Sequence, residues 1–157
     1  MSEYLSRPVV KNIVPTITFF EHEGHISVAA NSLLIRHILL NMPNCLFLMG
    51  STGEGTYFRD KPEVKRHYIE LVMKILKEQG QIKNIPVIVG IYGENPKEAI
   101  QDLANCLEAD PSISLVLPPP LKIKLEPEAQ WDFFSSVIKA TKNPVYKIGR
   151  ASCRERV

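Results

Sequence analysis

The sequence has little cysteine, no long apolar run and little excess of either charge. Its 157 residues include three cysteines, Cys45, Cys106 and Cys153, with spacings typical of neither a metal site nor a redox pair. No apolar stretch approaches the roughly 18 residues of a membrane-spanning helix. Residues 1–7 lack the apolar core of a signal peptide. We therefore expect a cytoplasmic protein with buried thiols and no membrane association.

Metal-binding and nucleotide-binding patterns are also missing. The glycine-rich stretch at residues 50–55 lacks the lysine of a P-loop. The four histidines do not have the spacing of metal ligands. They are His22, His25, His37 and His67. The formal net charge is only +2, and it vanishes without residues 148–157, so nucleic acid is not an expected partner. The sequence predicts neither a metal ion nor another cofactor.

The last ten residues do not fit the rest of the chain. Residues 148–157, Ile-Gly-Arg-Ala-Ser-Cys-Arg-Glu-Arg-Val, match the translation of a common short-read sequencing adapter. A genuine basic tail is the alternative. Because foreign segments are excluded from fold reasoning, we expect residues 1–147 to form the folded domain and residues 148–157 to be an artefact.

Apolar strands alternate with amphipathic helices along the chain. The predicted strands cover residues 12–18, 45–49, 85–90, 113–117 and 143–146, and the predicted helices cover residues 27–41, 61–79, 95–107 and 127–139. The strands are apolar without alternation, so both faces of a parallel sheet are expected to be covered. The pattern leaves two closures open, a doubly wound open sheet and the first half of a (β/α)8 barrel.

Residue preferences at helix starts and on helix faces predict N-caps and buried positions. Asp60 and Asn95 each precede a proline and an acidic residue, and both are expected to be N-caps. On the helix after Asp60, the apolar positions are expected to pack inward and the charged residues from Glu63 to Lys77 to face solvent. The aromatic cluster at Trp131, Phe133 and Phe134 is expected to pack against the sheet.

The most informative stretch is Gly50-Ser51-Thr52-Gly53-Glu54-Gly55. It follows an apolar strand and precedes a helix. Hydroxyls and backbone amides at the carboxyl end of a strand hold a carboxylate or phosphate without a fixed charge. A tight turn whose hydroxyls satisfy the backbone is the structural alternative. Glu54 is expected to orient this loop or to cap backbone amides.

These motifs resemble the dihydrodipicolinate synthase and N-acetylneuraminate lyase superfamily of class I pyruvate aldolases. Residues 50–54 are similar to the family's Gly-Ser/Thr-Thr-Gly-Glu loop. Residues 14–18, 85–100 and 143–146 are similar to its first strand, its third strand and helix, and the entry to its fifth strand. The resemblance implies an N-terminal fragment with the first half of a (β/α)8 TIM barrel, about four βα units plus a fifth strand.

The resemblance also implies site residues. In this family a lysine on the sixth strand forms a Schiff base with pyruvate or another 2-oxo acid. Gly50, Ser51, Thr52 and Gly53 would bind the substrate, and Ser51 would be the catalytic hydroxyl of a proton relay. The family's tyrosine would stand at position 148, where this chain has Ile148, and the Schiff-base lysine would lie further on. Lys122, Lys124 and Lys147 are expected to be exposed loop charges and not this lysine. The chain as written is therefore expected to be inactive.

The family's branches differ after the fourth strand. Many members carry a tyrosine pair where this chain has Pro118-Pro119-Pro120-Leu121. This departure favours an aldolase or lyase for a sugar-acid substrate such as 2-keto-3-deoxygluconate. The resemblance to the family also implies a homo-oligomer at full length. Tyr57 and Tyr92 are the remaining aromatic candidates near the site. A sugar-acid dehydratase of the same family and a non-catalytic carboxylate-binding α/β module are the alternatives.

Overall fold

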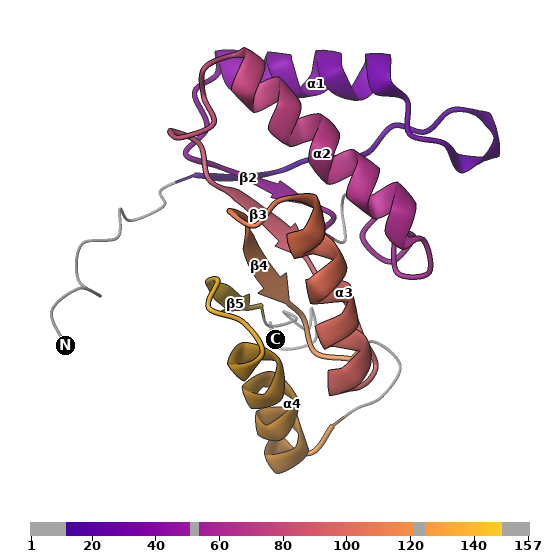
Figure 1. Ribbon diagram of the computed structural model, residues 1–157, viewed down its shortest axis with the longest axis vertical. Coiled ribbons are helices and arrows are strands. Elements are labelled where there is room, and N and C mark those ends of the chain that lie inside the picture. Colours follow the sequence, from indigo (N-terminus) through magenta and orange to yellow (C-terminus); the bar gives the residue numbers. More distant parts are fainter. Residues whose placement is uncertain (1–11, 51–53, 121–124, 149–157) are drawn as a thin grey trace, which may run out of the picture.

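The computed structural model describes residues 12–50, 54–120 and 125–148, and within these ranges it contains one five-stranded sheet (Figure 1). The strands are β1 (Ile13–Pro15), β2 (Cys45–Leu48), β3 (Val87–Gly90), β4 (Ser114–Leu117) and β5 (Val145–Lys147). The helices are the 3-10 turn η2 (His22–Gly24), α1 (Val28–Leu40), α2 (Pro62–Glu78), α3 (Pro96–Ala109) and α4 (Pro127–Lys139).

The order of the strands decides between the two closures that the sequence left open. All four strand pairings are parallel, and the spatial order β1-β2-β3-β4-β5 is the order along the chain. A doubly wound sheet reverses its strand order at a switch point. Here each helix returns the chain to the next strand, and the helices cover the outside of a curved sheet (Figure 1). The fold is the first half of a (β/α)8 barrel.

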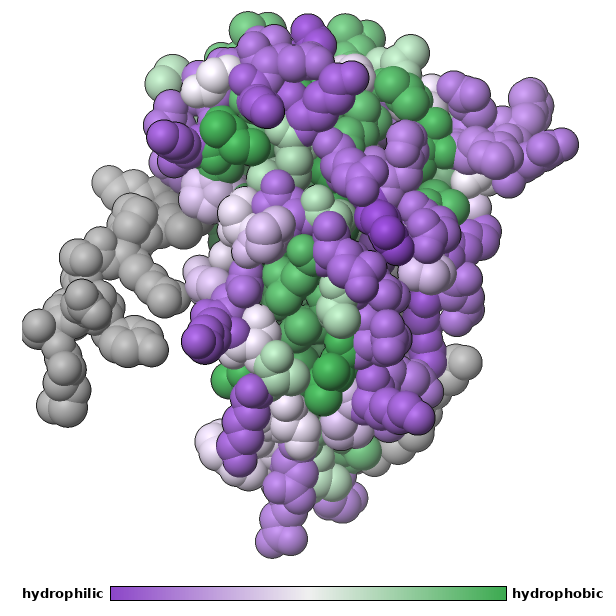
Figure 2. Space-filling view, in the orientation of Figure 1, coloured by the Kyte–Doolittle hydropathy of each residue, from purple (hydrophilic) through white to green (hydrophobic). Residues whose placement is uncertain are grey.

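The three inner strands β2, β3 and β4 are buried on both faces, as their unalternating apolar residues predicted, whereas the edge strands β1 and β5 are largely exposed. The larger core lies between the sheet and the helices and includes Leu46, Val89 and Leu115. The opposite face carries a small cluster of Cys45, Ile88 and Val116, against which Phe47 packs. Figure 2 shows that apolar side chains form a central band on one side of the molecule, with hydrophilic side chains on both sides of it.

The predicted N-cap is confirmed at Asn95 but not at Asp60. The Asn95 side chain accepts a hydrogen bond of 3.0 Å from the N–H of Glu98. Before α2, however, the N-cap is Lys61, so the prediction for Asp60 is wrong. The reason is that the Lys61 N–H still bonds the Phe58 carbonyl at 3.1 Å, which keeps Asp60 inside the preceding turn.

Two predictions about side-chain burial are wrong. Lys65 on α2 is only 1% exposed, although every charged residue from Glu63 to Lys77 was expected to face solvent. This lysine lies on the face of α2 that packs against β3 and α3, where Gly90 and Asp102 supply oxygen acceptors. On α4, Trp131 is 74% exposed, whereas Phe133 and Phe134 are buried as expected.

Strand β1 is shorter than predicted, and it ends at Pro15. The ladder continues for one more bond, since the N–H of Thr16 donates to the Phe47 carbonyl at 2.9 Å. This places the next residues of the chain beside the carboxyl end of β2. Among the described helices, none is long and apolar enough to cross a membrane.

Candidate functional site

The glycine-rich loop begins where β2 ends, at the edge of the sheet that holds the carboxyl ends of all five strands. Gly50 is buried, and its carbonyl accepts a hydrogen bond of 2.9 Å from the N–H of Gly55. This bond joins the two ends of the loop. The predicted site residues Ser51, Thr52 and Gly53 lie outside the described residues, so their predicted roles stay predictions.

The carbonyl of Met49 explains why two glycines surround this turn. Met49 has a φ of 56° and is fully buried. A Cβ on Gly55 would stand 2.1 Å from the Met49 carbonyl oxygen, and a Cβ on Gly90 would stand 2.3 Å from it. Both distances are far below van der Waals contact, so only glycine fits at these two positions.

Tyr92 provides the hydrogen bond to this carbonyl. Its hydroxyl donates to the Met49 oxygen at 2.7 Å, and the side chain is only 7% exposed. Burial, together with the negative charge of Asp102, raises the pKa of Tyr92 to about 12. The phenol therefore remains protonated, and able to donate, throughout the physiological pH range.

A second polar cluster ties the loop to the end of β1. Glu54 lies within the glycine-rich stretch, and its carboxylate accepts the N–H of Thr18 at 3.2 Å. The Tyr68 hydroxyl lies 3.5 Å from the Thr16 hydroxyl and donates to the Ile17 carbonyl at 3.3 Å. Burial raises the pKa of Tyr68, although its hydrogen bonds to Thr16 and Thr18 oppose the shift. Glu54 thus caps a backbone amide, as predicted.

Sequence reasoning missed the buried ion pair of Lys65 and Asp102. The Lys65 ammonium lies 2.7 Å from the Asp102 carboxylate and 2.8 Å from the Gly90 carbonyl oxygen. The same carboxylate oxygen accepts the N–H of Tyr92 at 2.8 Å. A signal for the pair was present, because each charge falls at helical spacing within a set of apolar positions.

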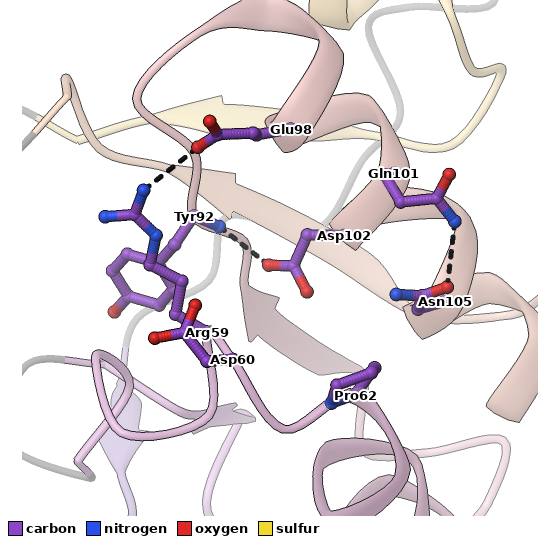
Figure 3. Close-up of a pocket in the computed structure, with 8 residues that line it drawn as sticks. All are labelled: Arg59, Asp60, Pro62, Tyr92, Glu98, Gln101, Asp102 and Asn105. Carbon is purple, nitrogen blue, oxygen red and sulfur yellow. Dashed lines mark hydrogen bonds and ion pairs between the residues drawn. The ribbon is translucent and has the colours of Figure 1, made fainter.

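A polar pocket of about 360 Å³ lies beside this cluster, and Tyr92 and Asp102 form part of its wall (Figure 3). Arg59 pairs there with Glu94 at 2.6 Å and with Glu98 at 2.9 Å. The backbone N–H of Glu94 holds the pKa of Glu98 below its ordinary value, and Arg59 adds to this effect. The lining residues are Arg59, Asp60, Pro62, Tyr92, Glu98, Gln101, Asp102 and Asn105.

The model of the Dihydrodipicolinate synthetase family matches residues 9–153. The chain belongs to that family. The predicted resemblance to dihydrodipicolinate synthases and N-acetylneuraminate lyases is therefore confirmed.

One curated relative and several solved structures are similar to this family member. Over 142 residues it is 28% identical to a protein of Emericella nidulans described as a probable mitochondrial 4-hydroxy-2-oxoglutarate aldolase, and the match covers 89% of this chain and 45% of the relative. A dihydrodipicolinate synthase from Bacillus anthracis superposes with a TM-score of 0.77 at 22% identity, covering 88% of this chain and 45% of that one. CdNal from Clostridium difficile, solved with mannosamine, gives a TM-score of 0.74 at 23% identity, and the match covers 90% of this chain and 47% of that one.

A further solved structure is YagE from Escherichia coli K12, a prophage protein of the dihydrodipicolinic acid synthase family solved in complex with pyruvate. Its TM-score is 0.74 at 20% identity, and the match covers 88% of this chain and 45% of that one. These structural likenesses show a shared fold. This family member spans less than half the length of the relatives that it matches.

Of the two aromatic candidates in this family member, Tyr92 contacts the turn at Met49, whereas Tyr57 does not. Tyr57 is a packing residue, since its hydroxyl donates to the Gly24 carbonyl at 3.2 Å and its ring carries the Lys61 ammonium at 3.4 Å. Tyr146 on β5 is 44% exposed and pairs in register with Val116. Within the described residues, no cluster of three or more His, Cys, Asp or Glu side chains is arranged to hold a metal ion.

The lysines that were set aside as exposed loop charges have different outcomes. Lys147 is exposed as predicted, but it lies in β5, with its ammonium 4.7 Å from the centre of the Phe134 ring. Lys122 and Lys124 lie outside the described residues. The N–H of Ile148 donates to the Leu117 carbonyl at 3.3 Å and extends the β4–β5 ladder.

Proposed function

We propose that the whole protein is a Schiff-base-forming 2-oxo-acid aldolase or lyase. The proposal rests on membership of the family together with the loop from Gly50 to Gly55 at the carboxyl end of β2. Functional groups of a (β/α)8 barrel gather at this end of the strands. An amine of the enzyme would condense with the substrate ketone and release water. The resulting iminium would accept the electron pair of the breaking carbon–carbon bond.

The proposed carboxylate site consists of Gly50, Ser51, Thr52 and Gly53. Thr52 and its backbone amide would hold the carboxylate of the 2-oxo acid, and Ser51 would pass protons during the reaction. The two glycines would let the backbone approach the ligand closely. The hydrogen bond from the Gly55 N–H to the Gly50 carbonyl, which joins the two ends of this loop, supports the proposal.

The proposed substrate class is a pyruvate-type 2-oxo acid that carries a polar, sugar-acid-like remainder. The name of the Emericella nidulans relative supports 4-hydroxy-2-oxoglutarate, and the proline-rich segment after β4 supports a substrate such as 2-keto-3-deoxygluconate. A sugar-acid dehydratase would use the same Schiff base and lose water rather than break a carbon–carbon bond.

Pyruvate titration of the 157-residue chain, followed by amide chemical shifts in NMR spectra, tests the carboxylate site. We expect shifts of the Gly50 and Gly55 amides, and about tenfold weaker binding in Thr52→Val, which loses one hydrogen bond to a charged group. Thr56→Val is the matched control, because Thr56 is exposed and lies beyond the loop. Unchanged binding in Thr52→Val contradicts the assignment.

Turnover is tested separately. We propose that the chain as written has no lyase activity, because Ile148 stands where the family's tyrosine is expected and no lysine is assigned to the Schiff base. Borohydride treatment with pyruvate should leave its mass unchanged. A trapped adduct, or a lyase rate above background, would contradict this proposal. If pyruvate binds without any trapping, a carboxylate-binding module becomes the better description of this chain.

The proposed domain covers residues 1–147, with residues 148–157 as foreign sequence, and resequencing the gene beyond the Tyr146 codon is the test. A continuing frame with a Tyr-Asn pair there would support an aldolase at full length. From the family resemblance, we propose that the full-length protein forms homo-oligomers.

We also propose a reducing compartment, the cytoplasm, since Cys45 and Cys106 are buried free thiols. Mitochondrial import, as in the name of the fungal relative, is the outcome that would overturn it.

A further inference from the structure

The turn from β2 into the candidate loop is held from three directions. Met49 adopts a left-handed φ of 56°, which a non-glycine residue keeps only when its surroundings enforce it. Its carbonyl oxygen lies against the backbone of Gly55 and Gly90, where a Cβ would come within 2.1 Å and 2.3 Å of it. The Tyr92 hydroxyl completes the surroundings with a hydrogen bond of 2.7 Å.

Tyr92 is itself fixed by buried charges on the helix side of the sheet. Its N–H donates to the Asp102 carboxylate at 2.8 Å, and the same oxygen lies 2.7 Å from the Lys65 ammonium. Lys65 also donates to the Gly90 carbonyl at 2.8 Å. The chain on both sides of Ile91 is therefore anchored, and the ring of Tyr92 extends from a rigid base (Figure 3).

We propose that Tyr92 is a positioning residue for the carboxylate loop, an inference that rests on the function proposed above. A peptide group is planar and trans, so fixing the Met49 carbonyl also fixes the N–H of Gly50 on the opposite side of the same plane. The hydroxyl of Tyr92 thereby sets the direction of the first amide of the loop. Tyr92 touches no substrate in this role, and it acts only through the Met49–Gly50 peptide.

The network places Lys65 and Asp102 in support of this tyrosine. Asp102 orients Tyr92 through its backbone N–H, and Lys65 neutralises the buried carboxylate while it holds the neighbouring Gly90 carbonyl. The two charges come from α2 and α3, so the packing of two outer helices is coupled to the geometry of a loop at the strand ends.

The test compares Tyr92→Phe with Tyr57→Phe in the 157-residue chain. Each variant removes one hydroxyl that donates to a backbone carbonyl, Met49 for Tyr92 and Gly24 for Tyr57. We expect Tyr92→Phe alone to speed hydrogen exchange of the Gly55 amide by about fivefold or more, the effect of one lost hydrogen bond. Amides in the middle of α2 should exchange at the wild-type rate in both variants.

Pyruvate binding separates this inference from the proposed function. If wild type binds pyruvate and Tyr92→Phe binds it several-fold more weakly while Tyr57→Phe does not, both stand. If wild type does not bind but the Gly55 amide still exchanges faster in Tyr92→Phe, the proposed function fails and the positioning role of Tyr92 stands. Gly55 exchange within about twofold of wild type, or equal changes in both variants, overturns the inference.

A measurement on the unmodified chain covers the case in which Tyr92→Phe does not fold. A buried hydroxyl that donates to a carbonyl exchanges slowly with water, so the Tyr92 hydroxyl proton should give its own NMR resonance, with a nuclear Overhauser contact to Gly55 or Gly90. Absence of that resonance, while the Tyr68 hydroxyl proton is observed, would overturn the inference.

Discussion

The ammonium of Lys65 lies 2.7 Å from the carboxylate of Asp102, and their side chains are 1% and 9% exposed. Replacing only one member of such a pair leaves a buried charge without a partner. We therefore expect Lys65→Met to lower the free energy of unfolding by about 3–5 kcal/mol, measured by urea denaturation with circular dichroism.

Lys74→Met is the matched control for this prediction, because Lys74 is exposed on the same helix. Its effect should stay within about 0.5 kcal/mol. Removing both charges in Lys65→Met/Asp102→Leu should recover part of the loss, but not all of it, because the N–H of Tyr92 then loses its acceptor. Similar values for Lys65→Met and Lys74→Met would contradict the burial of Lys65.

Gly90→Ala should be more damaging than an ordinary glycine replacement. The new Cβ would meet the Met49 carbonyl oxygen at 2.3 Å, so the backbone must shift. We expect a loss of about 2–4 kcal/mol in unfolding free energy. Gly80→Ala is the comparison, since among the described atoms none lies within 4 Å of its Cβ.

Gly80 has a φ of 65°, and its replacement should therefore cost only the roughly 1 kcal/mol of a left-handed residue. Thermal denaturation of both variants measures the difference. The close approach of Met49 to Gly90 would be refuted if Gly90→Ala were no less stable than Gly80→Ala.

Asn95→Ala tests the one predicted cap that the structure forms with a side chain. The Asn95 carboxamide accepts the Glu98 N–H at 3.0 Å, so its loss should cost about 1 kcal/mol. Ser27 is the N-cap of α1 but makes no side-chain cap hydrogen bond to the described residues. Ser27→Ala should therefore change the unfolding free energy by less than about 0.5 kcal/mol, and an equal loss in both variants would count against the capping geometry.

Stability should fall at alkaline pH because two thiols are buried. Burial raises the pKa of Cys45 and of Cys106 from 9.0 to about 11 in the folded protein. Below pH 9 both thiols are neutral in the folded and unfolded states. As the pH rises from 9 to 11, the unfolded chain ionises first, so unfolding becomes more favourable by roughly 2 kcal/mol for each thiol.

The difference between wild type and Cys45→Ala/Cys106→Ala isolates this effect, because the other titrating groups are common to both. Urea denaturation at pH 8 and at pH 10.5 measures it. We expect the wild-type unfolding free energy to fall more steeply with pH than that of the double variant. Parallel pH profiles would show that neither thiol is held neutral by burial.

Local patterns in the sequence were sufficient for most of the helices. The range of α4, Pro127–Lys139, and the cap at Asn95 were both predicted, since proline position, cap chemistry and helical spacing all act within a few residues. The prediction failed at Asp60, where one bond to Phe58 extended the preceding turn. Cap preferences are weak enough for a single such contact to override them.

The place of the glycine-rich loop after β2 was predictable from the sequence, but the contacts that support the loop were not. A hydroxyl-rich loop after an apolar strand indicated an anion site, and the glycines at positions 53 and 55 indicated a turn. The reason for Gly55 lies instead in the Met49 carbonyl, which also requires the distant Gly90 to be glycine. Lys65 was predicted to face solvent, and Asp102 was overlooked. The reason is that a charged residue on one helix does not reveal which side chain of another helix will lie opposite it.

Short-range chemistry thus specified the alternation of strands and helices, the parallel sheet and the place of the glycine loop. Only the tertiary structure distinguished the half-barrel from a doubly wound sheet, because strand order depends on which strands pair and not on the residues of any one strand. It also brought Tyr92 to Met49 and Lys65 to Asp102, across separations of 43 and 37 residues. Contacts of that range form only when packing of the whole sheet and its helices places the partners together.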